Sequence, residues 1–233
     1  MIEIENRDPA ADRPGLTLHA AFFYDLTVWL MTLGRERAFR EKLLHLAGLK
    51  PGEDVLDVGC GTGSLAIAAK RRVGPAGTVF GIDASPEMLA RAKKKARVAG
   101  LAVIFRNAAA QALPFAEGQF DIVLSTLMLH HLPRKSREQC VREINRVLKP
   151  GGHVLMVEFA ASGGKRHDLL GHFHRHGSVS LSDMITLFRD PGLHIEDSGG
   201  LGFAGMHFLL ATRTAGHGGT RVEDAHSVNS SLC

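Results

Sequence analysis

Tryptophan and tyrosine are scarce in this chain of 233 residues, which contains one of each beside 12 phenylalanines. No run approaches the ~18 consecutive apolar residues that a membrane-spanning helix needs. Residues 1–8 are too acidic and too interrupted for a secretory signal. The apolar content of 45% and the charged content of 22% are typical of soluble globular proteins. We therefore expect a chain that is neither membrane-spanning, nor collagenous, nor wholly disordered.

A strong excess of charge of one sign is also absent, since 28 basic side chains face 24 acidic ones and the net charge is +4. Nucleic-acid-binding proteins usually concentrate a stronger basic patch on one face, so we expect no nucleic-acid partner. The densest basic cluster, in residues 91–97, is interpreted as a solvated helix face. The three cysteines, Cys60, Cys140 and Cys233, form no CxxC pair and favour a reducing, cytoplasmic setting without disulfides.

Short apolar runs alternate with longer amphipathic stretches along most of the chain. The helical spacing of apolar residues in the longer stretches predicts helices between most of the runs. Strands that alternate with helices indicate βαβ units and a mainly parallel sheet. Lys-Pro-Gly sequences at 50–52 and 149–151 are predicted to separate a helix from the next strand, and Ser85 and Pro86 to begin a helix. The expected strands are residues 54–58, 78–82, 102–106, 120–125, 153–158, 194–198 and 207–212.

Two segments lie outside this alternation. Residues 16–49 are helix-like and rich in large apolar side chains, so we expect residues 1–49 to form an N-terminal helical cover over a domain spanning 50–213. The apolar side chains around Trp29 favour core packing or cover of an active site, and contact with a lipid surface stays an alternative. Residues 214–233 have no apolar period and are predicted to be a disordered tail.

A glycine-rich turn, DVGCGTG at 57–63, follows the first expected strand. Glycines let a ligand approach the backbone closely, and the helix that follows offers free N–H groups. Asp83 ends the next expected strand, 20 residues beyond Gly63. An acidic side chain at that place can accept hydrogen bonds from both hydroxyls of an adenosine ribose. Together, the turn and Asp83 predict a nucleoside-containing cofactor.

The residues around the turn distinguish between two cofactors. The dinucleotide fingerprint G-x-G-x-x-G, counted from Gly59, requires a glycine where Ser64 stands, and counting from Gly61 meets only its looser form. Asp57, just before the turn, would repel a pyrophosphate but could bind a cationic amino group. These residues favour S-adenosylmethionine over NAD, and an NAD-linked oxidoreductase stays the alternative.

Five segments follow one another along the chain: 55–63, 81–89, 111–115 with 119–123, 129–132 and 146–152. Their sequences and order resemble the motifs of class I S-adenosylmethionine-dependent methyltransferases. The chain is most similar to the methyltransferases of ubiquinone and menaquinone biosynthesis, over about residues 24–212. The resemblance implies a Rossmann-like α/β fold with a seven-stranded, mostly parallel sheet, helices on both faces and an antiparallel last strand.

The same resemblance implies a set of cofactor contacts. The turn would wrap the methionine moiety, Asp57 would support its ammonium, and Asp83 would bind the ribose. Tyr24 either closes over the cofactor or packs in the core. The remaining implied contacts are Gly59, Cys60, Gly61 and Gly63 in the turn, Ala84 and Met88 beside the adenine, and Ser125 beside the methionine moiety.

One position departs from the family pattern. Relatives usually have an aspartate where this chain has Ala109, and that aspartate accepts a hydrogen bond from the adenine amino group. The loss of one such bond would weaken cofactor binding by ~1 kcal/mol. The side chain of Asn107 and the backbone N–H of Ala110 are the candidate substitutes.

The implied reaction is methyl transfer to a small molecule, with C-methylation of a quinone precursor as the first interpretation. A phospholipid or small-amine N-methyltransferase is the alternative, and a non-catalytic cofactor-binding module is the alternative of another class. A base is needed only where the acceptor loses a proton. His130, His131 and Glu158 are the candidates, although the two histidines could instead shape their loop.

A second group of histidines invites a metal-site hypothesis. His172, His174 and His176 would share one face of a strand, as metal ligands do. Because this stretch has no strand signal, we interpret residues 163–177 as an acceptor-pocket or surface segment and predict no bound metal.

Overall fold

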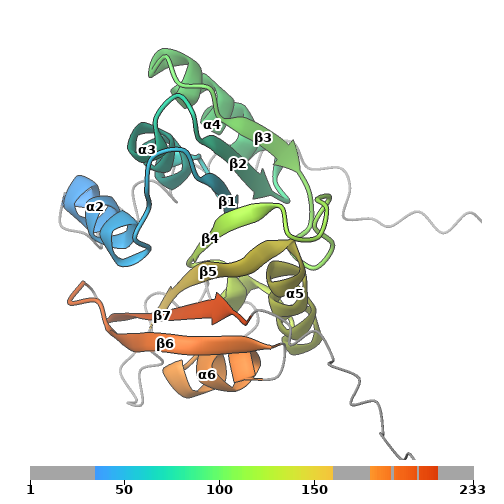
Figure 1. Cartoon of the computed structure of the whole chain (residues 1–233). Coiled ribbons are helices and arrows are strands. Elements are labelled where there is room, and N and C mark those ends of the chain that lie inside the picture. The colour runs from blue at the N-terminus through green and yellow to red at the C-terminus, as the bar shows by residue number, and fades with distance from the viewer. Residues whose placement is uncertain (1–34, 160–178, 190–191, 204, 215–233) are drawn as a thin grey trace, which may run out of the picture.

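The computed structural model describes residues 35–159, 179–189, 192–203 and 205–214, and Figure 1 shows their arrangement. The strands are β1 (Asp54–Val58), β2 (Thr78–Asp83), β3 (Ile104–Asn107), β4 (Phe120–Thr126), β5 (Leu148–Phe159), β6 (Leu193–Gly200) and β7 (Met206–Arg213). The helices are α2 (Glu36–Leu46), α3 (Ser64–Val73), α4 (Pro86–Val98), α5 (Arg134–Val147) and α6 (Leu181–Arg189), with a 3-10 turn, η1, at Leu129–His131.

The seven strands form one sheet in the order β3-β2-β1-β4-β5-β7-β6. The first five in this order are parallel, whereas β7 runs antiparallel between β5 and β6. In the centre of the sheet, Val55 of β1 is paired with Val79 of β2 and with Ile122 of β4. The expected fold class is confirmed, including the antiparallel last strand.

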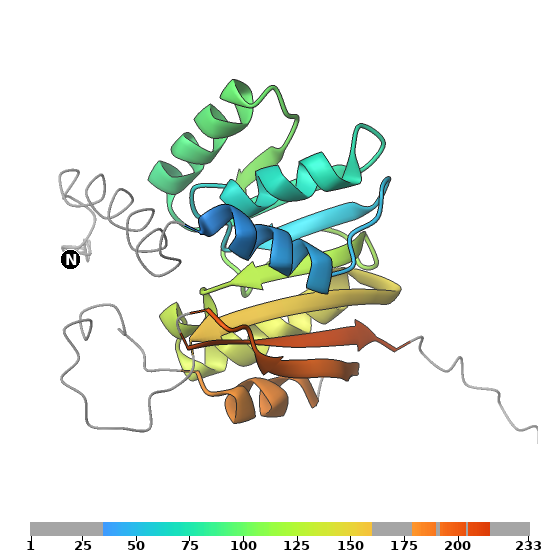
Figure 2. The ribbon, with the colours of Figure 1, turned by 90° about the vertical axis from the view of Figure 1, so that its left-hand side faces the viewer.

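Alternation along the strands builds two separate cores. In β1, Val55 packs in the core on the side of α2, α3 and α4, and its neighbour Leu56 packs in the core on the side of α5 and α6. Figure 2 shows α2 and α3 in front of the sheet and α5 behind it. Successive side chains on a strand point to opposite faces of the sheet. Whether a residue holds an odd or an even position along its strand therefore decides which helices its side chain meets.

The chain reverses its direction of progress through the sheet at β1. From β1 it moves outward to β2 and β3, and then returns to β4 on the other side of β1. In open α/β sheets a ligand binds in the crevice at such a reversal, beyond the carboxyl ends of the strands. The fold therefore predicts a ligand site at the carboxyl ends of β1, β2 and β4.

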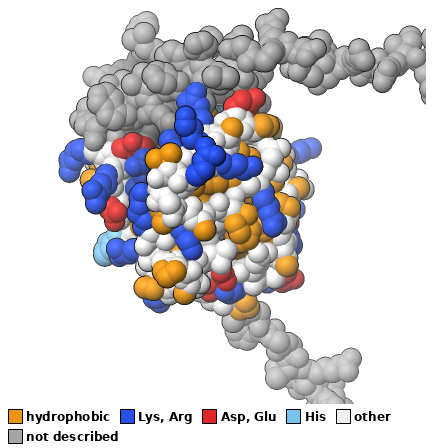
Figure 3. All heavy atoms as spheres, turned by 90° about the horizontal axis from the view of Figure 1, so that it is seen from above, with side chains coloured by type: hydrophobic (Ala, Val, Ile, Leu, Met, Phe, Trp, Pro, Cys, Tyr) orange, Lys and Arg blue, Asp and Glu red, His pale blue; other side chains and the backbone are white. Residues whose placement is uncertain are grey.

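Helix α4 begins as predicted. The Ser85 hydroxyl accepts a hydrogen bond from the backbone N–H of Met88 (3.2 Å), and Pro86 occupies the first helical turn. Lys93, Lys94 and Arg97 are exposed, and Lys and Arg side chains gather on the face seen from above Figure 1 (Figure 3). The interpretation of a solvated basic face therefore agrees with their exposure.

The start of β5 differs from the expectation. The Lys-Pro-Gly sequence was predicted to precede this strand, but β5 already begins at Leu148, which is paired with Phe120. The pairing register shifts at this point: Phe120 is paired with Leu148, but Ile122 is paired with His153, so the extra residues of β5 form a bulge. Lys149 forms ion pairs there with Asp54 (3.2 Å) and Asp121 (2.8 Å) and thereby ties the starts of three strands together.

Several expectations concern residues outside the described ranges. They are Tyr24 and the segment around Trp29, the histidines at 172, 174 and 176, and the tail beyond residue 214. In the part of the chain that the structure describes, no helix has the length and apolar character to cross a membrane.

Gly63 and Gly100 allow a test of how closely the glycine-rich turn packs. Both have positive φ, but a Cβ on Gly63 would lie 2.7 Å from Ala92 Cβ, whereas one on Gly100 would meet nothing within 4 Å. We expect Gly100→Ala to lower the free energy of unfolding by about 1 kcal/mol through backbone strain alone. Gly63→Ala should lower it by about 2 kcal/mol more, because α4 must move. Urea unfolding measures both, and equal losses would contradict close packing at Gly63.

Candidate functional site

Two cavities adjoin at the carboxyl ends of β1, β2 and β4, with Gly59 and Leu127 lining both. The first, here called the α2 cavity, has a volume of about 60 Å³ and lies between α2 and the end of β1. The second, the α4 cavity, has a volume of about 230 Å³ and lies between the start of α4 and the loop after β4. The fold thus brings the glycine-rich turn to the junction of two chemically different cavities.

Gly59 permits the turn to lie against the loop after β4. Its φ is +73°, and a Cβ there would lie 2.4 Å from Met128 Cγ. Its backbone N–H and that of Cys60 both donate to the carbonyl oxygen of Ile82, at 2.9 and 2.8 Å. A side chain at residue 59 would therefore push the turn away from the loop and widen the junction of the cavities.

Asp83 connects the turn to the start of α4. One carboxylate oxygen accepts from the backbone N–H of Gly61, and the other from the backbone N–H of Ser85, each at 2.8 Å. A carboxylate offers about four lone-pair positions, so each oxygen keeps capacity for one more donor. Asp83 also lines the α4 cavity, so the two hydroxyls of a diol bound there could each donate a hydrogen bond to one of its carboxylate oxygens.

Asp57 lines the α2 cavity and is 2% exposed. The pKa of its carboxyl is raised to about 7: burial raises it most, a hydrogen bond from the backbone of Ala66 lowers it, and the nearby Asp83 charge adds a smaller rise. Its Oδ2 atom has no hydrogen-bond partner among the described residues. A buried carboxylate oxygen without a partner is unfavourable, so this position favours a ligand with a cationic donor.

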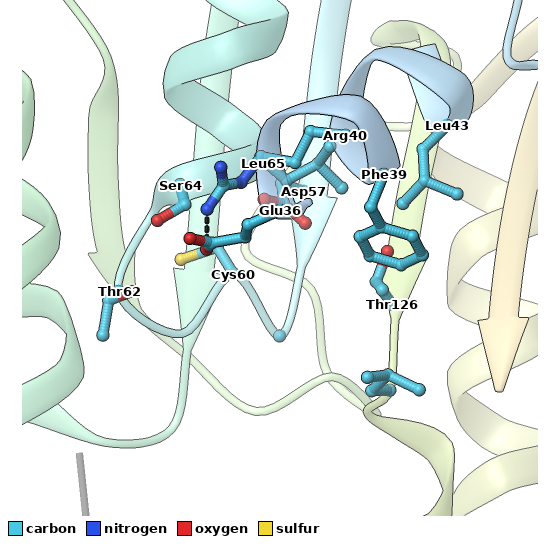
Figure 4. A pocket seen from close by; sticks show the side chains of 12 residues that line it. Glu36, Phe39, Arg40, Leu43, Asp57, Cys60, Thr62, Ser64, Leu65 and Thr126 are labelled. Carbon is cyan, nitrogen blue, oxygen red and sulfur yellow. Dashed lines mark ion pairs between the residues drawn. The ribbon is translucent and has the colours of Figure 1, made fainter. Parts of the chain in front are cut away.

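Helix α2 forms the opposite wall of the α2 cavity. Phe39 and Leu43 are buried there, while Glu36 and Arg40 form an ion pair one helical turn apart. In Figure 4, this pair lies over the turn that carries Cys60, on the side of the cavity where Asp57 is found. The cavity therefore contains both signs of charge.

The loop after β4 is held by a buried carboxylate. One oxygen of Glu158 accepts from the backbone N–H groups of Met128 (2.9 Å) and Leu129 (2.6 Å), and the other is 2.7 Å from His130 Nδ1. Glu158 is fully buried and His130 is 6% exposed. The exposed His131 ring lies with its centroid 4.0 Å from that of His130 and lines the α4 cavity.

Comparison with known proteins shows which proteins the chain is similar to. Residues 55–152 match the model of a methyltransferase domain. A demethylmenaquinone methyltransferase of Lactobacillus johnsonii is 36% identical over 159 residues, which are 67% of this chain and 64% of that protein. The chain therefore contains a methyltransferase domain and is similar to class I S-adenosylmethionine-dependent methyltransferases.

Two further relatives agree with this family. A ubiquinone/menaquinone biosynthesis C-methyltransferase UbiE of Laribacter hongkongensis is 36% identical, over 66% of this chain and 63% of that protein. An S-adenosylmethionine-dependent methyltransferase structure from Aquifex aeolicus matches with a TM-score of 0.70 at 22% identity, over 84% of this chain and 98% of that one, which supports the fold. The matches span a little under two thirds of the two curated relatives' lengths.

The residues of both cavities fit S-adenosylmethionine, the cofactor of this methyltransferase family. The methionine ammonium would give Asp57 Oδ2 the donor that it lacks among the described residues. Asp83 keeps acceptor capacity for the ribose hydroxyls, and Met88 and Ala110 offer apolar surface for the adenine. The similarity to S-adenosylmethionine-dependent methyltransferases supports the expected cofactor.

Most of the expected contact residues meet at these cavities. Gly59, Asp57 and Cys60 line the α2 cavity, and burial raises the pKa of the Cys60 thiol, which keeps it neutral. Gly63 lines neither cavity, because it packs against Ala92 and Phe105. The expected residues that line the α4 cavity are Gly59, Gly61, Asp83, Ala84, Met88, Ala110 and His131.

Ser125 points to the face of the sheet opposite to the α2 cavity. Ile122 and Leu124 pack on the α2 side, so alternation turns Ser125 toward α5 and Thr126 back toward α2. Ser125 is fully buried, whereas Thr126 lines the α2 cavity with Asp57. Ser125 Oγ has no hydrogen-bond partner among the described residues, and the contact that the family pattern implies for Ser125 stays a prediction.

Ala109 lines neither cavity, although Ala108 and Ala110 on either side line the α4 cavity. The amide nitrogen of Asn107 donates to the carbonyl oxygen of Asp83 (2.9 Å), so Asn107 ties the end of β3 to the end of β2. The weaker adenine binding that the Ala109 departure implies stays a prediction, as does the compensation by the Ala110 backbone.

Sequence reasoning missed the polar residues of α2, Glu36 and Arg40, and the loop residue Leu127. The signal for α2 was present, since Glu36, Arg40 and Leu43 recur at the spacing of one helix face. Leu127 has φ +55°, unusual for a residue with a branched side chain, and only the folded loop shows it. Within the described ranges no three His, Cys, Asp or Glu side chains gather as a metal site.

The raised pKa of Asp57 predicts a pH dependence of stability. Between its ordinary value of 3.8 and about 7, the native carboxyl holds a proton that the unfolded chain has lost. The free energy of unfolding of the ligand-free protein should therefore fall as pH rises from about 4 to 7. Asp57→Asn should remove this part of the slope in urea unfolding across that range.

Cofactor affinity should show the opposite trend, since an ammonium prefers the ionised Asp57. Binding of S-adenosylmethionine, measured by calorimetry, should strengthen up to about pH 7 and then level off. An Asp57→Asn variant with the same stability slope as the wild type would rule out Asp57 as the titrating group.

Glu158 allows a test of the loop anchor. Glu158→Ala leaves the backbone N–H groups of Met128 and Leu129 buried without their acceptor, and should lower the free energy of unfolding by about 3 kcal/mol. Glu158→Gln keeps one side-chain oxygen as acceptor for both N–H groups, so its loss in free energy of unfolding should be clearly smaller. Hydrogen exchange should show faster exchange of these two amides in the Ala variant. Equal stability of the two variants would contradict the anchoring role.

Proposed function

We propose that this protein transfers a methyl group from S-adenosylmethionine to a carbon of a small quinone precursor. The observation that carries the proposal is the junction at Gly59, where the buried Asp57 and the ribose-type acceptor Asp83 line adjoining cavities. The acceptor class is supported by the demethylmenaquinone and ubiquinone/menaquinone methyltransferases to which the chain is similar.

The chain's own contribution to such a reaction is alignment and exclusion of water. When bound, the cofactor supplies a methyl group on a sulfonium centre. Asp57 holds the ammonium end and Asp83 holds the ribose, so the two carboxylates fix the cofactor on both sides of Gly59. Leu127, which lines both cavities, holds the loop after β4 against this junction through its backbone hydrogen bond to Val157 (2.8 Å).

A ring carbon activated by a hydroxyl requires a base to accept a proton. Of the three candidates, His131 is the one that lines a cavity in the described part of the chain. Both oxygens of Glu158 accept hydrogen bonds within the protein, and His130 is their partner on one side. We therefore assign proton acceptance to His131, with Glu158 and His130 as positioning residues.

The surroundings of this site are part of the same proposal. The expected cover by residues 1–49 over the domain spanning 50–213 is supported, in its described part, by α2, whose buried Phe39, Leu43 and Leu44 pack into the core beside the α2 cavity. The partner is a small acceptor rather than a nucleic acid, and peripheral contact with a membrane is compatible with a lipid-like acceptor. The buried free thiols of Cys60 and Cys140 suit a reducing, cytoplasmic setting.

The test is an anaerobic assay with S-adenosylmethionine and a short-chain demethylmenaquinol. We expect S-adenosylhomocysteine and the methylated quinol to appear in equal amounts. His131→Ala should reduce turnover by about 100-fold and leave cofactor affinity unchanged.

Two results would contradict the proposal. Folded protein that binds the cofactor but forms no S-adenosylhomocysteine with a panel of quinols, phospholipids and amines would be a binding module. Product formed on an amine or phospholipid, and not on quinols, would retain the methyl transfer and overturn the acceptor class.

A further inference from the structure

The α2 cavity is lined by charged side chains other than Asp57, and these have no role in the cofactor contacts described above. Among its described lining residues, the charged side chains are Glu36, Arg40 and Asp57. Asp57 serves an ammonium, but the methionine moiety of the cofactor also carries a carboxylate. Both ends of an amino acid must be satisfied when they leave water, because a buried charge without a partner is strongly unfavourable.

Arg40 is the cation that this carboxylate would meet. It projects from α2 over the glycine-rich turn, on the same cavity as Asp57 (Figure 4). A guanidinium binds a carboxylate through two parallel N–H donors, and such charge-assisted pairs are among the stronger hydrogen bonds. Residue 40 precedes the region matched by the methyltransferase-domain model, which begins at residue 55.

The Glu36 carboxylate now occupies the guanidinium of Arg40. The two side chains are 28% and 19% exposed, and a partly solvated i,i+4 pair on a helix contributes little stability. A ligand carboxylate can therefore replace Glu36 without a large loss. The existing pair also keeps the guanidinium extended over the cavity before the ligand arrives.

The rest of α2 fixes the direction of Arg40. Phe39 is buried and meets Phe203 edge-on, with ring centroids 5.4 Å apart. Lys42 donates to the carbonyl oxygen of Leu201 at 2.6 Å. These contacts tie α2 to the loop before β7, so the helix cannot rotate Arg40 away from the cavity without losing them.

From this arrangement we propose that Arg40 binds the methionine carboxylate of the cofactor, exchanging Glu36 for the ligand. The α2 cavity is then an amino-acid site with Arg40 and Asp57 at its two poles. This inference rests on the proposed function, because it takes S-adenosylmethionine as the ligand.

The experiment compares S-adenosylmethionine with decarboxylated S-adenosylmethionine, which differ at the carboxylate alone. Calorimetry on the full chain should show that the wild type binds the carboxylated ligand about 10- to 100-fold more tightly. Arg40→Met should abolish this preference by weakening only the carboxylated ligand. Arg37→Met, which removes an exposed arginine from the same helix, should preserve it.

A second variant keeps the proposal testable if Arg40→Met does not fold. Glu36→Gln releases Arg40 from its competitor and should strengthen binding of S-adenosylmethionine several-fold, with no change for the decarboxylated ligand. Equal effects of Arg40→Met on both ligands, or weaker binding of S-adenosylmethionine by Glu36→Gln, would overturn the inference. Failure of folded wild type to bind either ligand would instead contradict the proposed function.

Discussion

The burial of the Asp57 carboxylate is the constraint on which the site depends. A carboxylate at the end of a central strand, 2% exposed and with one oxygen lacking a partner among the described residues, is unfavourable in the ligand-free protein. Burial raises the pKa of this carboxyl to about 7, so the neutral, protonated form becomes accessible near neutral pH. A buried carboxylate of this kind lowers stability near neutral pH and suits a cationic ligand, a common relation between function and stability.

The glycine-rich turn and the loop after β4 are shaped by the same requirement. Two residues beyond Asp57, Gly59 lets the turn close against Met128, and the backbone N–H of Met128 is in turn held by the carboxylate of Glu158. Two acidic residues therefore act at different depths. Asp57 lines the α2 cavity, whereas Glu158 replaces the backbone partners that an irregular loop cannot provide for itself.

Much of this arrangement was predictable from the sequence. Alternating strands and helices indicated the sheet, and the spacing from the turn to Asp83 predicted two carboxylates at one edge. Alternation on β4 could also have separated Thr126 from Ser125. The start of β5 was not predictable, since a proline and two glycines are typical of a turn, and only the bulge opposite Phe120 makes them part of a strand. The positive φ of Leu127 likewise depends on tertiary contacts.

The position of α2 explains why a domain motif alone gives an incomplete cofactor site. Residues 55–152 supply the turn, Asp57 and Asp83, but among the described lining residues the only cation on the α2 cavity comes from a helix that precedes them. A carboxylate and an ammonium on one carbon need opposite charges a few ångströms apart. A β-strand end that already carries Asp57 and lies near Asp83 is a poor place for a cation to be added. A helix packed across the turn can supply that charge, and this gives α2 a role in ligand binding as well as in covering the sheet.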